Sequence, residues 1–343
     1  MDRFLTIDST KGGNGDIWMR LVGFYAVADL LPGFKLRICI PSYFRTLAEF
    51  AFGDKLTIVT DSSFKVDLEY TNLGIRHLYK DLLKGKRFIS PYQRAVIQDK
   101  KKKELKDYVN TWIFNAADRL GVVQIPAAKW ISGYQGYLDI IGIKKLRHIS
   151  YENFTIQVEK QHVRLIEKFR QPVPASVELN IPGDLKEYTV VFPNGTGRQF
   201  VPLWWAKKHM PDAYYAFFAN DSYADTFKNA GLKIIRFYRS EDIIRLAQEA
   251  RWTVSTDSFP SHLLQTATNK CTILITGTLK GRIVSPAFKG KVVDADATCH
   301  PCLHLARDLH PLCAAGHSEC INWHLHAYTS NILKSVCELA DHS

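Results

Sequence analysis

Four cysteines near the end of the chain have the spacing of metal ligands. They follow the pattern C-x2-C-x10-C-x6-C, at Cys299, Cys302, Cys313 and Cys320. Thiolates at this spacing can converge on one tetrahedral ion, and sulfur ligands favour zinc or iron over hard cations. Because protein can fill all four positions, we expect a structural site without chemistry of its own. The alternatives are a neighbouring histidine in place of one cysteine, or four free thiols in a reduced loop.

Two glycine loops could bind phosphate groups. Residues 11–16 (KGGNGD) and 193–198 (PNGTGR) each lie between a short apolar run and a segment with helical spacing. Neither loop is a nucleotide-binding fingerprint by itself, but such loops present backbone N–H groups to phosphate or carboxylate at a helix N-terminus. Asp16 ends the first loop. It could cap the following helix, or it could act as a general base aimed into a cleft between domains.

A third group of polar residues surrounds an expected strand-to-helix turn. It combines an acid, two hydroxyls and an imidazole in Asp257, Ser258, Ser261 and His262. These groups could bind a ribose and a diphosphate. The alternative is a capped helix that carries an incidental histidine.

The chain carries a net charge of +11, which indicates anionic partners. Nucleic acid, a phosphorylated glycolipid, an acidic membrane face and a nucleotide all fit this charge. Much of the charge is concentrated in one region, at Lys84, Lys86, Arg87, Arg94 and the four lysines of 100–103. These side chains could line a groove for a phosphorylated acceptor, or form the solvated face of a helix.

The elements that must position these groups alternate between strands and helices. In the first half, the pattern predicts strands at 4–7, 36–40 and 55–59 and helices at 17–31 and 42–50. In the second half, it predicts strands at 188–192, 232–237, 252–255 and 271–276, and helices at 201–209, 240–250 and within 257–267, with Ser240 as an N-cap. This alternation predicts parallel sheets, which bind ligands at the carboxyl ends of their strands.

A proline-rich stretch, residues 171–183, separates the two series. We therefore predict two α/β domains, 1–172 and 173–343, that face each other across a cleft. Residues 91–170 are mostly helical in pattern, and 323–339 form a predicted C-terminal helix. The N-terminus does not resemble a signal peptide, and no apolar run is long enough to span a membrane, so we expect a soluble protein in a reducing compartment.

Together these motifs resemble glycosyltransferase family 9, which includes the ADP-heptose:lipopolysaccharide heptosyltransferases. The first loop of that family ends in Gly-Asp, as Gly15 and Asp16 do, and its helix stops at Pro-Gly, as at 32–33. Its second domain opens with a Pro-x-Gly loop that carries a basic residue, here Arg198, before an aromatic helix. Many members also carry the cysteine pattern seen at 299–320.

The donor motif of the family, Asp-Ser/Thr-Gly-x-x-His, matches Asp257, Ser258 and His262. This chain departs from the family at Phe259, where the family has glycine, and at Arg198, where it often has lysine. The first change adds bulk near the donor. The second keeps the charge and allows two hydrogen bonds to a diphosphate.

The resemblance implies a GT-B fold, in which two Rossmann-like domains face each other and the C-terminal one holds most of the donor. It also implies an inverting transfer without a catalytic divalent metal, with Asp16 as the base and Arg198 at the leaving group. The implied donor-binding residues are Asn194, Gly195, Thr196, Gly197, Asp257, Ser258, Ser261 and His262. The implied acceptor-binding residues are Gly13, Asn14, Lys84, Lys86, Arg87 and Arg94.

The resemblance further implies a nucleotide-sugar donor, with ADP-heptose expected, and a bacterial surface glycan such as lipopolysaccharide core as acceptor. Members related to the autotransporter heptosyltransferases, which also have a cysteine-bound metal, would act on protein instead. A nucleic-acid acceptor would fit the charge as well. Outside this enzyme class, the alternative is a non-catalytic zinc-knuckle protein that binds nucleic acid. The enzyme would work in the cytoplasm, either free or peripherally bound to the inner membrane.

Overall fold

The computed structural model describes residues 3–10, 13–31, 33–60, 68–69, 149–195, 200–275, 284–285 and 287–294. These residues form two β-sheets, and every strand in both sheets runs parallel to its neighbours. The predictions for the lysine-rich region, for the cysteines at 299–320 and for the helix at 323–339 lie outside the described residues.

The first sheet comes from the amino-terminal part of the chain. Its strands are β1 (Arg3–Asp8), β2 (Phe34–Cys39), β3 (Leu56–Val59) and the short β4 (Leu68–Glu69), in the order β3-β2-β1-β4. Parallel strands need crossover connections, which α1 (Asn14–Ala28), the 3-10 turn η1 (Ser42–Phe44) and α2 (Arg45–Phe52) supply. Every residue of α1 from Ile17 to Val27 is buried, so this helix is covered on more than one side.

The second sheet has six strands in the order β10-β9-β8-β5-β6-β7. They are β5 (Thr189–Phe192), β6 (Tyr214–Phe218), β7 (Lys233–Phe237), β8 (Trp252–Thr256), β9 (Cys271–Ile275) and β10 (Lys291–Asp294). The connecting helices are α8 (Leu203–His209), α9 (Tyr223–Asn229), α10 (Ser240–Glu249) and α11 (Phe259–Ala267), and the 3-10 turn η3 (Leu185–Glu187) precedes β5. From one edge, the third, second, first, fourth, fifth and sixth strands follow one another, which is the order of a Rossmann sheet.

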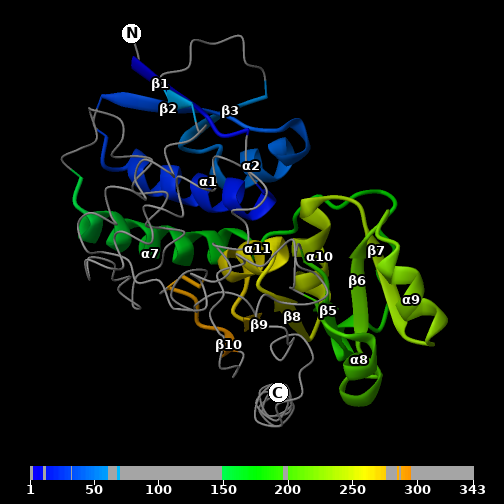
Figure 1. The fold of residues 1–343 in the computed structure, drawn as a ribbon. Helices are drawn as coiled ribbons and strands as arrows, with labels where there is room; N and C mark the ends of the chain where they lie inside the picture. Colours follow the sequence, from blue (N-terminus) through cyan, green and yellow to red (C-terminus); the bar gives the residue numbers. More distant parts are fainter. Residues whose placement is uncertain are drawn as a thin grey trace, which may run out of the picture.

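A long helix, α7 (Tyr151–Lys168), joins the two parts. The Ser150 side chain caps it by accepting a hydrogen bond from the Asn153 N–H at 3.1 Å. Helix α7 packs against both α1 and α11, so the layers in Figure 1 run from the first sheet through α1 and α2, then α7, α10 and α11, to the second sheet. The buried Trp18 indole N–H donates to Thr266 Oγ1 at 3.0 Å across this layer. One hydrophobic core therefore extends from sheet to sheet.

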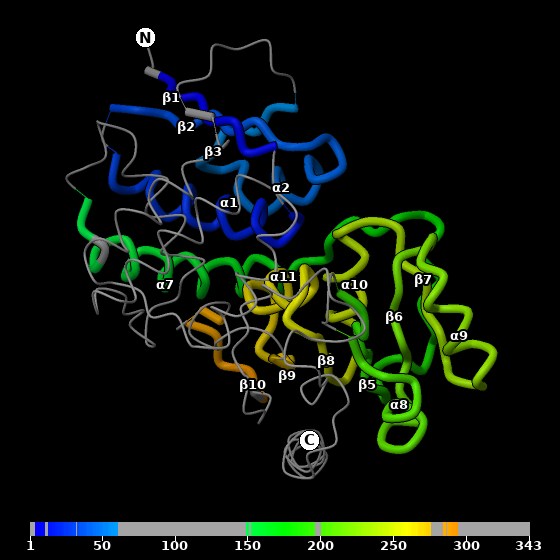
Figure 2. Tube along the Cα trace, viewed as in Figure 1, coloured from blue at the N-terminus to red at the C-terminus, as the bar shows by residue number. Residues whose placement is uncertain are grey.

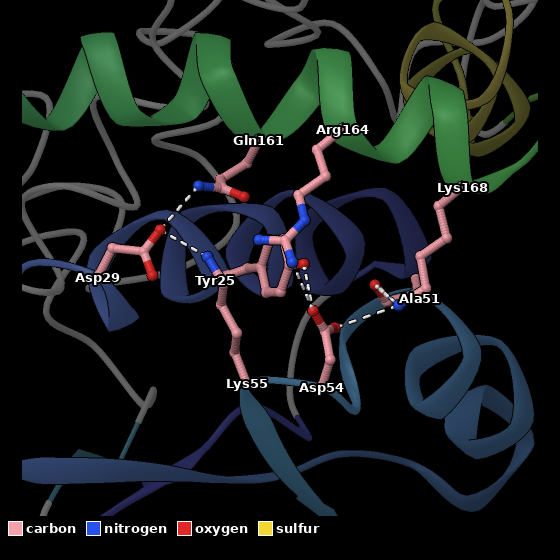
Figure 3. Close-up of polar contacts among 8 residues, drawn as sticks. All are labelled: Tyr25, Asp29, Ala51, Asp54, Lys55, Gln161, Arg164 and Lys168. Carbon is pink, nitrogen blue, oxygen red and sulfur yellow. Dashed lines mark hydrogen bonds and ion pairs between the residues drawn. The ribbon is translucent and has the colours of Figure 1, made fainter.

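A polar network fixes α7 to the first sheet's helices (Figure 3). The Asp54 carboxylate accepts hydrogen bonds from the Tyr25 hydroxyl at 2.9 Å, from Lys168 at 3.1 Å and from Arg164 at 3.2 Å. Partial burial alone would raise the pKa of Asp54, but the hydrogen bonds from Tyr25 and Lys168 outweigh it and lower the pKa. The charged form of Asp54 therefore stabilises the attachment of α7.

The stretch after α7 is held against the second sheet's helices, and Figure 2 follows the chain past α10 toward β5. The buried Asp242 carboxylate accepts hydrogen bonds from the Ser176 N–H at 2.7 Å and from the Ser176 hydroxyl. The Gln248 side-chain amide donates to the carbonyls of Phe169 at 2.6 Å and of Gln171 at 2.8 Å. The proline-rich stretch is thus anchored to α10 at both of these points.

Most of the predicted elements are confirmed within one to three residues, and two details are corrected. Ser240 is the first residue of α10 and not its N-cap; Arg239 precedes the helix, and its N–H donates to Asp242 at 3.0 Å. The helix predicted at 42–50 begins with the η1 turn. The sequence patterns missed β4, β6, α9 and β10. Within the described residues, no helix is both long and apolar enough to cross a bilayer.

Candidate functional site

The order of the second sheet reverses between β5 and β8, the point at which open α/β sheets bind ligands. These two strands are paired so that Phe192 lies opposite Ser255 at their carboxyl ends. The loop that begins at Pro193 therefore lies beside the turn that begins at Asp257. Two motifs that are more than 60 residues apart in the sequence meet at this switch point.

The turn after β8 is almost entirely buried. Its polar groups Asp257, Ser258, Ser261 and His262 are between 1% and 9% exposed. The Ser258 N–H donates to the Thr256 carbonyl at 2.7 Å, and the Ser261 hydroxyl donates to the Ser258 carbonyl at 2.8 Å. These bonds define the backbone conformation where α11 begins.

His262 extends from this turn to the first glycine loop. A Cβ atom added at Gly15 would lie 2.5 Å from His262 Cδ2 and 3.3 Å from its Nε2, so only glycine allows the imidazole to come this close. Burial lowers the pKa of His262 to about 4, although the nearby Asp16 carboxylate acts to raise it. The imidazole is therefore neutral at pH 7. Its Nδ1 is buried and has no hydrogen-bond partner within the described residues.

Asp16 is not the N-cap of α1, which is Gly13, but the third residue of the helix, from which it makes the return contact of a capping box. Its Oδ2 accepts a hydrogen bond from the Gly13 N–H at 3.0 Å at the start of α1. The side chain is exposed and close enough to His262 to influence its charge. Capping and catalysis are thus compatible here, because the capping bond involves one oxygen of the carboxylate. The role as a base stays a prediction.

The first domain brings two aromatic residues to this point that the sequence motifs did not reveal. The Tyr43 hydroxyl donates to Asn14 Oδ1 at 3.0 Å. The ring of Phe44 packs edge-to-face on Phe259, with centroids 5.5 Å apart. The aromatic pair at 43–44 follows β2, and its position after a predicted strand was the one signal for it in the sequence.

The second glycine loop also has a partner that the sequence did not indicate. Asn194 donates from its side-chain amide to Asp221 Oδ2 at 2.6 Å. Asp221 follows β6, which neighbours β5, so it reaches the same edge of the sheet. Asn194 also bridges to Phe200, and the Val201 N–H donates to the Pro193 carbonyl at 2.7 Å. The two ends of the loop are thereby closed against each other.

The remaining predicted site residues lie outside the described part of the chain. They are Thr196, Gly197 and Arg198 of the second loop, the basic residues Lys84, Lys86, Arg87 and Arg94, and the cysteines Cys299, Cys302, Cys313 and Cys320. Among the residues that the structure does describe, no cluster of histidine, cysteine or carboxylate side chains could hold a metal ion. The metal site stays a prediction.

The described groups have the chemistry of a site for a phosphorylated ligand. The start of α11 carries two buried hydroxyls, Ser258 and Ser261, and the neutral imidazole of His262, and the Pro193 end of the second glycine loop lies beside it. A carboxylate from the other domain, Asp16, completes the set. This combination can hold a diphosphate on one side and accept a proton on the other.

Comparison with solved structures reveals a similar fold over the whole chain. A glycosyltransferase family 9 structure from Veillonella parvula has a TM-score of 0.51 at 8% identity, covering 99% of this chain and 98% of that one. Escherichia coli heptosyltransferase WaaC with ADP gives 0.44 at 14% identity over 91% and 97% of the two chains. Escherichia coli ADP-heptose lipopolysaccharide heptosyltransferase II gives 0.46 at 13% identity over 98% of both. No protein-family model and no curated protein matches the sequence. The Veillonella structure thus establishes a GT-B-like fold with two Rossmann-like sheets.

Proposed function

We propose that this protein, which has the two-sheet fold of a family 9 glycosyltransferase, is an inverting glycosyltransferase that uses a nucleotide-diphospho-sugar. The observation that carries the proposal is the position of the 257–262 turn, which we name the donor turn. It lies at the switch point of the second sheet, beside the Pro193 loop, and His262 contacts Gly15 of the first sheet's glycine loop. A donor bound at the switch point would place its sugar toward the Asp16 carboxylate.

The mechanism is a single displacement. Asp16 removes the proton of the acceptor hydroxyl, whose oxygen forms a bond to the anomeric carbon from the face opposite the leaving group. The bond between that carbon and the diphosphate oxygen breaks, and the nucleoside diphosphate leaves with the electron pair. Configuration at the anomeric carbon is therefore inverted.

Charge that develops on the diphosphate needs preorganised donors. In our proposal Arg198 and the loop residues Asn194, Gly195, Thr196 and Gly197 supply them from one side. Ser258, Ser261 and His262 supply them from the other, with Asp257 binding the donor beside them. A neutral imidazole suits this role because it can donate one hydrogen bond without adding a buried charge, and the pKa of His262, lowered to about 4, keeps it neutral.

The substrates are proposed from the sequence resemblance and the charge. The donor is ADP-heptose, and the acceptor is an anionic bacterial surface glycan such as lipopolysaccharide core. Gly13 and Asn14 bind this acceptor together with Lys84, Lys86, Arg87 and Arg94. Protein and nucleic-acid acceptors are the alternatives that a substrate screen must include. We place the enzyme in the cytoplasm, at or near the inner membrane.

The cysteine cluster has a supporting role in this proposal. Its four thiolates would bind zinc or iron as a structural site. A non-catalytic zinc-knuckle protein would have no need for two Rossmann-like sheets whose glycine loop and donor turn meet. The arrangement of the described residues therefore favours the enzyme.

The test is a donor screen with the purified full-length chain. Nucleoside diphosphate release is measured for a panel of ADP-, GDP- and UDP-sugars that includes ADP-heptose, with glycolipid, protein and oligonucleotide acceptors, and products are identified by mass spectrometry. Asp16→Asn should bind the donor normally and lose transfer by a factor of about 100 or more. Asp29→Asn, which changes a carboxylate at the other end of α1, is the matched control and should remain active. Normal turnover by Asp16→Asn would refute the assignment of the base.

A further inference from the structure

Phe259 makes a contact between the two halves of the molecule. It is the first residue of α11, directly after Ser258 of the donor turn, and it is half-buried. Its ring packs edge-to-face on Phe44 of the first domain, with an interplanar angle of 78° and centroids 5.5 Å apart. Aromatic pairs prefer this geometry. Phe44 itself is fully buried, so the contact is fixed on the first-domain side.

The contact continues to the first glycine loop. The ring of Tyr43 lies against Phe44 with centroids 5.2 Å apart, and the Tyr43 hydroxyl donates to Asn14 Oδ1 at 3.0 Å. Tyr43 is 56% exposed, so packing alone does not explain its position. The hydrogen bond does, because Asn14 opens α1 two residues before Asp16. Three consecutive contacts thus lead from the donor turn to the loop that carries the acid.

This route is separate from the contact between Gly15 and His262. That contact limits how close the two loops can come, since the imidazole already touches the glycine. The contacts of Phe259 with Phe44 and of Tyr43 with Asn14 oppose separation of the same two segments. With one contact that prevents closer approach and another that prevents separation, the distance between the loops is defined.

We propose that Phe259, Phe44 and Tyr43 form an aromatic bridge that positions the Asp16 loop relative to the donor turn. Phe259 is accordingly a positioning residue, and the bulk that it adds at a glycine position of the resembling family serves this purpose. The inference rests on the proposed function for its catalytic consequence. The bridge itself is a property of the fold and can be tested without a substrate.

The first test is amide hydrogen exchange in the full-length protein. The Ile17 N–H donates to the Gly13 carbonyl at 3.1 Å and reports opening of the first turn of α1. Phe259→Leu and Tyr43→Phe should each raise its exchange rate about threefold to tenfold. In the double variant, the fold-increase in exchange rate should be smaller than the product of the two single fold-increases, because both changes act through one chain of contacts.

The matched control is Phe227→Leu, the same change at a buried aromatic residue of α9 that packs on Tyr215 and Phe217 within the second sheet's core. It should lower stability without a selective change at Ile17. Unchanged exchange at Ile17 in Phe259→Leu, or an equal change in Phe227→Leu, would overturn the bridge.

The second test uses the transfer reaction. In Phe259→Leu, kcat should fall about tenfold while the KM for the donor changes less than threefold, because the base is misplaced and the donor turn is intact. An unchanged kcat would overturn the positioning role and leave the proposed function standing. If the native protein transfers no sugar, the proposed function fails, and the exchange experiment alone decides whether the bridge exists.

Discussion

Gly15 is required because of the side chain that faces it. Its backbone conformation is that of an ordinary helix start, but a Cβ atom would lie 2.5 Å from His262 Cδ2. Gly15→Ala should therefore destabilise the fold by about 1–3 kcal/mol, the usual effect of overpacking, and weaken nucleotide binding. Urea unfolding and ADP titration measure the two effects. Gly183→Ala, at a position with open space around it, is the control and should be neutral.

Two buried histidines make stability depend on pH. Burial lowers the pKa of His162 to about 3 and that of His262 to about 4. The unfolded chain takes up these protons near pH 6.5, before the folded protein does. Their contribution to the free energy of unfolding is thus complete above about pH 6.5 and is lost as the pH falls toward the folded pKa values. The loss amounts to at most about 1.4 kcal/mol per pH unit for each histidine.

Urea unfolding between pH 7.5 and 4.5 tests this dependence. The slope of the free energy of unfolding against pH contains a contribution from each histidine. His262→Gln should remove the contribution of His262, and His162→Gln that of His162. The contacts of His262 with Gly15 could not be predicted from sequence, because the two residues are 247 positions apart and meet through the tertiary packing of α1 on α11. The polar residues of the 257–262 turn are apparent from the sequence, and the phosphate ligand that they suggest stays a prediction.

At the scale of elements, the polar network around Asp54 should hold α7 in place. Asp54→Asn removes the carboxylate charge that pairs with Lys168 and Arg164. Because the site is partly exposed, the free energy of unfolding should fall by about 1 kcal/mol at pH 7. Because the pKa of Asp54 is lowered in the folded state, this difference should begin to shrink near the ordinary pKa of aspartate and be lost as the pH falls through the lowered folded-state pKa. Chemical denaturation of the native protein and of Asp54→Asn in a pH series from 7 to below 3 measures it.

The control for this network is Glu49→Gln. It removes an exposed ion pair with Arg45 within α2, and such a pair contributes little. If both variants lost the same free energy of unfolding, the proposed role of Asp54 in holding α7 would be contradicted.

The sequence predicted the larger elements because their apolar runs are bounded by glycine or proline, as α1 is by the Gly13 loop and the turn at Gly33. It missed β6, whose residues YYAFF are a continuous run without a period that separates strand from helix. It missed β10 because that strand has four residues and two of them are charged. Missing β6 also concealed Asp221, the partner of Asn194.

For the whole molecule, the continuous core predicts cooperative unfolding. Trp18, Phe52 and Phe169 lie in the same hydrophobic cluster as Leu263 of α11 and Ile273 of β9. We therefore expect the described parts to unfold in one calorimetric transition, with equal calorimetric and van't Hoff enthalpies. Two well-separated transitions would show that the sheets are independent.

A buried carboxylate at the junction of the two halves provides another test. Glu241, 2% exposed at the start of α10, faces the backbone of Leu47 in α2, and desolvation raises its pKa. A raised pKa means that its stability contribution is complete below the ordinary glutamate range and is lost as pH rises. Glu241→Gln should thus be more stable than the native chain at pH 7.5, with no gain at pH 4. Glu249→Gln, in a half-buried ion pair with Arg245 at the other end of α10, is the control.

The hydrogen bond from Trp18 to Thr266 also limits how this protein can be recombined. If the half of the chain that forms the second sheet were exchanged for that of a relative, the proline-rich stretch would be the obvious crossover point. A chimera joined there would bury the Trp18 indole against a foreign α11, without its oxygen partner and with mismatched side chains around it. A successful exchange would have to transplant α1, α7 and α11 together, or redesign their shared surface. In this fold, the helical layer between the two sheets must therefore be exchanged as one unit.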